Sequence, residues 1–341
     1  MSHFVVWVDA EDPFLIDEIM EPFCENTENP DYLEFQAKDE EYRQKYETAK
    51  TDCVRMPNGS LLTVYDFAFR RHYTVKDGTI YQKASGPLHH EKRTKKAKRM
   101  TFLPDYPLKK VFRTYKDYMV NCGYKYDENE DAYGYYTNPN SFYDWYVIGG
   151  RWPHMFLVRA DCAFVIDGEK SWFNEDTEPP YAPDGYRWVA GARKRDIAWD
   201  AMKRLGIQEH MKLFHTLEDC FKGEKPPKDY PFAKITEEGI LNWQSYLYIK
   251  GETLEQYLER HDLGPTCQYP CSPYGFVHDA EYCSRGDMGW FGISTNEKDE
   301  KAWREIVQRY LEELPEDTLL VSLDCHVYNK GEYLTWDIMF L

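Results

Sequence analysis

The chain has 341 residues, 42% hydrophobic and 16% aromatic, which is enough for one large or two ordinary domains and too apolar for a disordered chain. A formal net charge of -17 argues against a general affinity for nucleic acid, whose phosphates it would repel. No run reaches the roughly 18 apolar residues of a membrane span, the opening segment lacks the basic start of a secretory signal, and nine scattered cysteines fit a reducing compartment, so we expect a cytoplasmic protein.

Short strands and helices are predicted to alternate along the first part of the chain. Residues 3–8 are nearly all apolar and indicate a buried strand. Apolar side chains spaced for one helical face predict helices over 38–50 and 109–123. Strand-like pieces are expected between them, at 61–66 and 79–82.

Longer elements are predicted in the second part. One helix is expected near 198–222, where Gly206 is a candidate break, and another over 299–314. Strands are predicted at 318–327 and 333–340, on either side of a hairpin turn.

These elements predict an α+β fold with a mixed sheet. From a strand at 274–279 onward, the C-terminal unit reads strand–helix–strand–strand, and the N-terminal strand would join the same sheet. Most of the chain would then be a large central insertion. We expect a single domain over 1–341 with an inserted subdomain near 167–262.

The least ordinary stretch is Asn138-Pro-Asn-Ser-Phe-Tyr-Asp-Trp-Tyr-Val-Ile-Gly-Gly-Arg-Trp152. Its Gly149–Gly150 pair would let the backbone approach another surface closely and turn N–H groups toward an anion. Arg151 offers a planar fork suited to phosphate or carboxylate, and Trp145 and Trp152 offer flat faces for a base. Aromatic side chains, a cation and backbone N–H groups without side-chain cover together favour a nucleotide-like ligand.

Further polar side chains would complete this ligand site. Asp144 and Asn138 would read hydrogen-bond donors of the ligand, and Arg193 and Arg195 form a second cationic cluster. A structural alternative stands beside this interpretation. Asp144 would pair with Arg151 and brace a turn, the aromatic rings would fill a core, and the two glycines would mark a bulge or a tight crossing.

A second polar set would converge if the sheet forms as predicted. Asp324 and His326 are two residues apart on one strand and therefore share a face, while His3 lies on the first strand. Two imidazoles and a carboxylate suit acid–base work or metal binding. The alternative is a solvated face or a core histidine with its hydrogen bonds satisfied. Cys325 would point to the opposite face from His326, which makes the two a poor nucleophile–base couple.

Two other clusters are less specific. The basic run over 91–99, preceded by His89 and His90, would hold a phosphate-bearing ligand or form a solvated loop. Cys267 and Cys271 lack a paired second knuckle, so no metal site is predicted, and nothing in the sequence indicates a cofactor.

Four segments resemble a family of uncharacterised proteins from bacteriophages, prophages and their hosts. They are the opening Met-Ser-His-Phe, the central Asp-Trp-Tyr-x-Ile-Gly-Gly-Arg-Trp, Met288-Gly-Trp-Phe-Gly, and Asp317-Thr-Leu-Leu with Asp-Cys-His326. The resemblance spans nearly the whole chain and lends no catalytic residues. It implies a phage-related context, in which cytoplasmic accessory proteins counter host immunity and some sequester nucleotide second messengers.

We therefore predict a protein that binds an anionic small molecule of nucleotide type and sequesters a host immune signal. Two alternatives stay open. One is a protein–protein inhibitor whose acidic, aromatic surface engages a host effector. The other is a hydrolase of the same ligand, with His3, Asp324 and His326 as its catalytic candidates.

Overall fold

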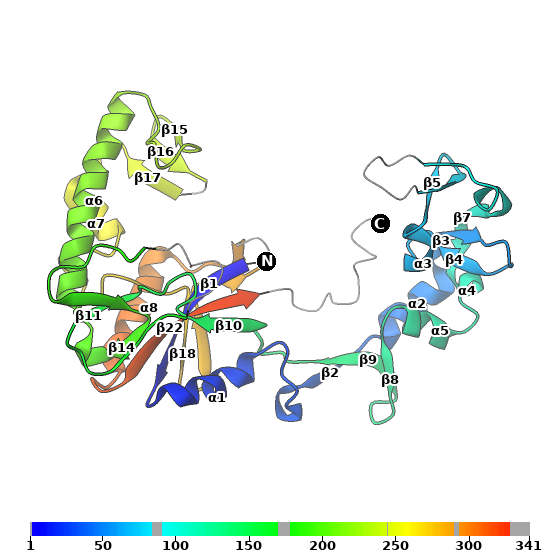
Figure 1. Cartoon of the computed structure of the whole chain (residues 1–341), viewed down its shortest axis with the longest axis horizontal. Coiled ribbons are helices and arrows are strands. Elements are labelled where there is room, and N and C mark those ends of the chain that lie inside the picture. Colours follow the sequence, from blue (N-terminus) through cyan, green and yellow to red (C-terminus); the bar gives the residue numbers. More distant parts are fainter. Residues whose placement is uncertain (1, 84–90, 170–177, 244, 290–292, 328–341) are drawn as a thin grey trace. The chain divides into compact units, whose positions relative to one another are not determined.

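The computed structural model describes residues 2–83, 91–169, 178–243, 245–289 and 293–327 (Figure 1). Helices and strands alternate along these residues, and the strands form mixed and antiparallel sheets, so the predicted α+β fold is confirmed. The predicted strand at 333–340, His89 and His90, and three residues of the Met288-Gly-Trp-Phe-Gly segment lie outside the described residues.

The chain divides into two compact units. Described residues up to Asn26 and from Asn140 onward form the first unit, and Thr27–Pro139 form the second. The inserted unit is therefore 27–139, whereas 167–262, where the sequence predicts an inserted subdomain, belongs to the first unit.

A seven-stranded mixed sheet forms the centre of the first unit in the described part of the chain. Its central strands are β1 (Ser2–Ala10) and β22 (Leu319–Val327), which pair antiparallel along their whole lengths. The other strands are β10 (Trp145–Ile148), β12 (Val165–Ile166), β14 (Gly191–Arg193), β18 (Gly275–His278) and β19 (Glu281–Ser284). β18 runs parallel to β1 on one side, and β14 and β10 pair with successive parts of β22 on the other. The N-terminal strand thus joins a sheet from the C-terminal part of the chain, as predicted.

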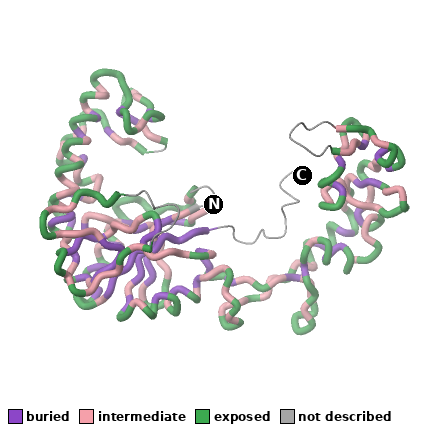
Figure 2. The backbone as a smooth tube through the Cα atoms, in the orientation of Figure 1, coloured by how far each residue is buried: buried purple, intermediate pink, exposed green. Residues whose placement is uncertain are grey.

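Both faces of this sheet are covered, which explains why β1 and β22 are nearly continuous apolar runs. One face packs against α8 (Glu300–Glu313), α6 (Trp199–Lys222) and β11 (Phe156–Arg159), and Trp7 is fully buried there. The other face packs against α1 (Ile16–Met20). Figure 2 shows that burial in this unit is concentrated in the sheet.

The two long helices confirm the predictions at 299–314 and 198–222. α8 begins after Asp299, whose side chain accepts hydrogen bonds from the backbone N–H groups of Lys301 and Ala302. α6 continues through Gly206, where an added Cβ would lie 2.8 Å from Cδ2 of Leu263. This glycine makes room for a neighbouring side chain and does not end the helix.

A smaller core extends the first unit beyond the sheet. It joins the second half of α6 to α7 (Leu254–Arg260) and to a three-stranded sheet. That sheet consists of β15 (Lys234–Ile235), β16 (Gly239–Asn242) and β17 (Ser245–Ile249). Two further pairs are β11 with β13 (Tyr186–Val189) and β20 (Asp287–Met288) with β21 (Ser294–Thr295).

His261, just after α7, makes the stability of the first unit depend on pH. Burial, aided by the charge of Arg260, lowers the pKa of His261 to about 4 from an ordinary 6.5. In the unfolded chain, His261 becomes protonated near pH 6.5, whereas in the folded chain it stays neutral until about pH 4. The free energy of unfolding therefore falls as the pH drops from 6.5 toward 4. We expect a loss of roughly 1–2 kcal/mol, allowing for partial access of water.

Urea denaturation of the wild type and of His261→Phe at pH 7 and pH 5 measures this effect. The variant should lose less stability than the wild type on acidification. His215→Phe is the matched control, because the His215 side chain is 61% exposed. A pH dependence that is unchanged in His261→Phe would contradict the assignment.

The second unit contains two small cores. Its strands are β2 (Glu34–Ala37), β3 (Lys50–Arg55), β4 (Leu61–Thr63), β5 (Tyr73–Lys76), β6 (Thr79–Gln82), β7 (Thr101–Pro107), β8 (Lys125–Asp127) and β9 (Ala132–Thr137). Its helices are α2 (Asp39–Thr48), α3 (Phe67–Arg70), α4 (Leu108–Val111) and α5 (Tyr115–Asn121), with a 3-10 turn at Ala97–Arg99. One core consists mainly of tyrosine rings from α2 and α5, and the other surrounds Phe69 and Tyr73.

The helix predicted over 109–123 is two shorter helices. The backbone is extended at Phe112, which ends α4. Thr114 then caps α5 in a reciprocal pair with Asp117, each side chain accepting from the backbone N–H of the other. A Thr three residues before an Asp is typical of the first turn of a helix. Here this capping pair starts a new helix, although the apolar spacing continues from the helix before it.

None of the helices in the described part of the chain is long and apolar enough to cross a membrane.

Candidate functional site

Three side chains form a row across neighbouring strands of the central sheet. His326 on β22 is the register partner of His3 on β1 and of Trp145 on β10. The ring centroid of His326 lies 4.9 Å from that of His3, edge-on, and 4.8 Å from that of Trp145, stacked at 16°. Because paired residues of neighbouring strands project from the same face, the sheet itself fixes this row.

Asp324 orients His3. Its Oδ1 lies 2.8 Å from Nδ1 of His3, and the two side chains are 0% and 7% exposed. Burial lowers the pKa of His3, and the neighbouring Asp324 carboxylate opposes this effect in part. His3 is therefore neutral near pH 7 and donates its Nδ1–H to Asp324.

Asp144 orients His326 in the same way. Its Oδ1 lies 2.6 Å from Nδ1 of His326 and also accepts the backbone N–H of Trp145 at 3.0 Å. The backbone N–H of Asp144 donates to the carbonyl of His326 at 3.0 Å, which ties the two residues together a second time. Nε2 of His326 is buried and has no hydrogen-bond partner within the described ranges. An imidazole that donates from Nδ1 keeps a lone pair on this nitrogen.

The Gly149–Gly150 pair packs against Asp324. Its φ angles are +72° and +46°, in the left-handed region, and a Cβ at Gly150 would lie 2.3 Å from Cβ of Asp324. The N–H of Gly149 donates to the carbonyl of Ser322 at 2.8 Å, and the N–H of Arg151 donates to Oδ2 of Asp324 at 3.0 Å. The anion that this backbone binds is the protein's own carboxylate. The glycine pair forms the tight crossing offered as the alternative, and the N–H of Gly149 is taken by a carbonyl of the protein, so a ligand contact from this residue stays a prediction.

Trp145 and Arg151 reach the surface at this end of the sheet. Trp145 is 37% exposed, Arg151 is exposed and Trp152 is half-buried. The backbone N–H of Arg151 donates to Oδ2 of Asp324, which places this residue beside the carboxylate that orients His3. Asn138, by contrast, is 2% exposed, so the structure gives no support to its predicted role as a ligand contact.

Arg193 and Arg195 lie toward the other end of β22. β14 pairs Arg193 with Leu319, seven positions before His326, a separation of roughly 24 Å along a strand. Arg193 donates to the carbonyl of Asp317, and Arg195 forms an ion pair with the side chain of the same residue. The structure does not bring these two cations to the His3–His326–Trp145 row.

A cavity of about 500 Å³ adjoins the row on its acidic side. Asp144 and Trp145 line it together with Asp17, Glu169 and Tyr146, whose side chain leaves β10 on the opposite face from Trp145. Carboxylates make this cavity unfavourable for an anion.

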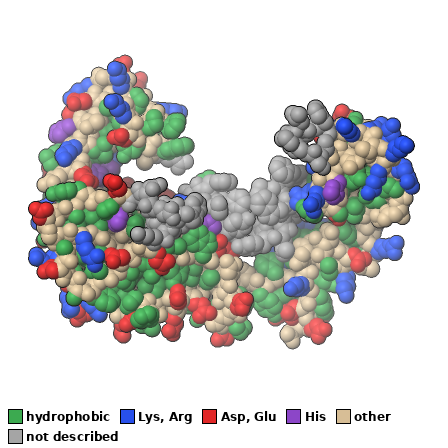
Figure 3. Space-filling view, in the orientation of Figure 1, with side chains coloured by type: hydrophobic (Ala, Val, Ile, Leu, Met, Phe, Trp, Pro, Cys, Tyr) green, Lys and Arg blue, Asp and Glu red, His purple; other side chains and the backbone are tan. Residues whose placement is uncertain are grey.

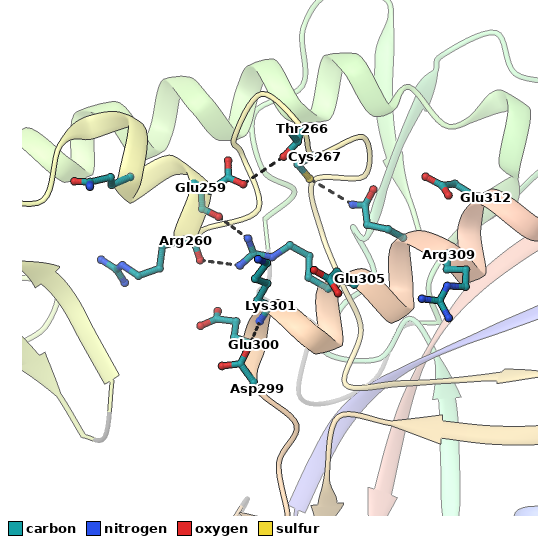
Figure 4. A pocket seen from close by; sticks show the side chains of 13 residues that line it. Glu259, Arg260, Thr266, Cys267, Asp299, Glu300, Lys301, Glu305, Arg309 and Glu312 are labelled. Atoms are coloured by element: carbon teal, nitrogen blue, oxygen red, sulfur yellow. Dashed lines mark hydrogen bonds between the residues drawn. The ribbon is translucent and has the colours of Figure 1, made fainter.

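A larger cavity, about 760 Å³, lies between α7 and α8 (Figure 4). Side chains of both charge signs line its wall. Glu259 accepts a hydrogen bond from Thr266 at 3.3 Å, and Arg304 donates to the carbonyl of Glu259 at 2.6 Å. A wall that carries both signs of charge favours neither an anion nor a cation.

All nine cysteines are free thiols, several of them buried. Cys267 donates to the carbonyl of Tyr269 at 3.0 Å. Burial raises the pKa of Cys325 well above its usual value, so this thiol stays protonated and is a poor nucleophile. Across the residues that the structure describes, no three His, Cys, Asp or Glu side chains are placed to hold a metal ion.

No family model, curated protein or solved structure matches the chain. The row and its two carboxylates are therefore interpreted from their chemistry.

Sequence reasoning did not foresee two features of this site. One is the Asp144–His326 pair, which depends on β10 lying beside β22. The other is the contact between Gly150 and Asp324. A strand-like Trp-Tyr-Val-Ile run after Asp144 was the only signal that could have placed Asp144 at a sheet edge.

Proposed function

We propose that the protein binds an anionic small molecule of nucleotide type at the His3–His326–Trp145 row. A host immune signal is the ligand that the phage resemblance favours, and its sequestration in the cytoplasm of the infected cell would be the biological role. The observation that carries the proposal is the position of Trp145 and Arg151 beside two oriented imidazoles.

Each of these groups fits one part of such a ligand. Trp145 stacks on His326 with one face and keeps exposed ring area for a base. Arg151 supplies a cation for phosphate oxygens. His326 supports the indole from beneath and is itself held by Asp144.

Hydrolysis of the same ligand is a second candidate, favoured by the two His–Asp pairs. A carboxylate that accepts Nδ1–H holds the imidazole in the tautomer whose Nε2 takes up a proton. With ring centroids 4.9 Å apart, one imidazole could take a proton from the attacking hydroxyl or water while the other, once protonated, gives one to the leaving oxygen. His326 is the base in this scheme, and Asp144 and Asp324 are positioning residues.

One experiment separates the two candidates. The protein is incubated with cyclic oligonucleotides and NAD-derived signals, washed and heated, and the released molecule is identified by mass spectrometry. Intact ligand supports binding, and converted ligand supports hydrolysis. Trp145→Ala should weaken binding about 10-fold, as expected for one lost stacking contact. His326→Gln should slow any conversion by about 10²–10⁴-fold and leave a bound ligand detectable.

Trp243→Ala is the matched control, since Trp243 is 82% exposed in the same unit and far from the row in the fold. The proposal is contradicted if no member of the panel is retained or shifts the melting temperature. Equal losses in Trp145→Ala and Trp243→Ala would also count against it. Retention of a host protein with no small molecule would favour the inhibitor alternative.

A further inference from the structure

The charge of this protein is divided very unevenly between its two units. Residues 27–139 contain 20 Lys and Arg against 17 Asp and Glu, whereas the rest of the chain contains 22 against 42. Residues 50–116 alone contain 16 cations and five carboxylates, a net charge of +11. The overall charge of -17 therefore conceals a strongly basic segment, and Figure 3 shows Lys and Arg gathered over this unit.

The five carboxylates of residues 50–116 are too few to balance the 16 cations of this segment. Three of the five carboxylates are already engaged. Asp66 caps α3, Asp52 accepts the backbone N–H of Asp105, and Glu91 pairs with Lys76 at 2.7 Å. The surplus of positive charge in this segment therefore favours a partner with negative charge.

The basic run over 91–99 is part of the folded unit. Ala97 and Met100 are buried in the same small core as Phe69 and Tyr73, and Lys92 bridges to β6. The basic run and α3 therefore pack on the same core. Their cations are all exposed: Arg70, Arg71, Lys92, Arg93, Lys95, Lys96, Lys98 and Arg99. We call these eight residues the basic surface.

An exposed aromatic ring lies within the basic surface. Phe67 is 62% exposed at the first position of α3. The guanidinium carbons of Arg71 and Arg70 lie 5.6 and 6.0 Å from its ring centroid. A solvent-facing ring flanked by two guanidinium groups offers a base both a stacking surface and cations for its phosphate.

We propose that the second unit binds single-stranded nucleic acid through the basic surface and Phe67. The cations bind the phosphates without regard to sequence, and Phe67 stacks on an unpaired base. A duplex keeps its bases stacked inside, so Phe67 favours a single strand. This binding function is separate from the ligand site of the first unit and needs none of its residues.

Fluorescence anisotropy with a labelled 20-nucleotide single strand, titrated with the full chain between 50 and 200 mM salt, tests the proposal. In the variant Lys95→Glu, Lys98→Glu, Arg99→Glu, we expect affinity at 50 mM salt to fall about 10- to 100-fold. The slope of log K against log salt should shrink by about 2, or about 0.7 for each lost phosphate contact. Phe67→Ala should weaken binding about 5-fold or more without changing the slope.

The matched control is Lys225→Glu, Lys228→Glu, Lys250→Glu, which changes the net charge equally at exposed positions of the first unit. It should bind like the wild type. The proposal is overturned if the single strand is not bound at 50 mM salt, or if both triple variants lose affinity equally. It is also overturned if duplex binds as tightly and Phe67→Ala has no effect, or if phosphatidylglycerol vesicles bind and the oligonucleotide does not.

Discussion

Gly150→Ala is expected to lower the free energy of unfolding of the first unit by about 2–5 kcal/mol and to disrupt the pairing of His3 with Asp324. Two costs add. An alanine in the left-handed region costs about 1–2 kcal/mol. Its Cβ would also lie 2.3 Å from Cβ of Asp324, which is fully buried, and forcing extra volume into a packed site costs about 1–3 kcal/mol.

Gly185→Ala isolates the backbone cost from the packing cost. Gly185 has a φ of +80°, also left-handed, but an added Cβ there meets nothing within 4 Å. This control should lose only the conformational share, about 1 kcal/mol. Urea denaturation followed by tryptophan fluorescence compares the two variants. Equal losses of unfolding free energy in Gly150→Ala and Gly185→Ala would show that the contact with Asp324 adds nothing to the loss.

Asp324→Ala is expected to have the larger effect, about 3–5 kcal/mol, because it breaks a buried pair and leaves its partners behind. His3 would lose the acceptor of its Nδ1–H, and the backbone N–H of Arg151 would lose its own at 3.0 Å. The Asp324 carboxylate favours protonation of His3, so its removal should lower the pKa of His3 further.

Two measurements test this expectation. Denaturation gives the loss of stability, and NMR titration of the imidazole protons gives the pKa of His3. Asp161→Ala is the control, because Asp161 is exposed and its pair with Arg159 lies at the surface. It should change stability by no more than about 0.5 kcal/mol. An unchanged or raised pKa of His3 in Asp324→Ala would contradict the assigned pairing.

Long periodic patterns predicted much of the first unit. The helices at 199–222 and 300–313 and the central strands at both ends of the chain follow from local apolar spacing, which needs no knowledge of the fold. The convergence of His3, Asp324 and His326 followed from the same reasoning, because it required only that the N-terminal strand join the last described one. A two-residue alternation then placed Asp324 and His326 on one face.

The remaining features depend on pairing between distant segments. β10 and β22 are about 180 positions apart in sequence, and no local signal says that Asp144 will meet His326. For the same reason, Arg193 was predicted to share a site with Arg151, although the two residues lie beside opposite ends of β22. The separate unit at 27–139 was missed because its two cores are small and its elements are short, so no long periodic pattern marks its boundaries.

The pairing of β1 with β22 also has a consequence for biosynthesis. β1 leaves the ribosome first, yet the residues that flank it, 275–278 and 319–327, are translated near the end. The described residues of the second unit, 27–139, are translated as one continuous stretch well before residues 275–327, while the apolar Val-Val-Trp-Val run must wait for its partner strands. We expect a nascent polypeptide halted before residue 319 to hold that run exposed, which makes it a natural point of capture for a chaperone.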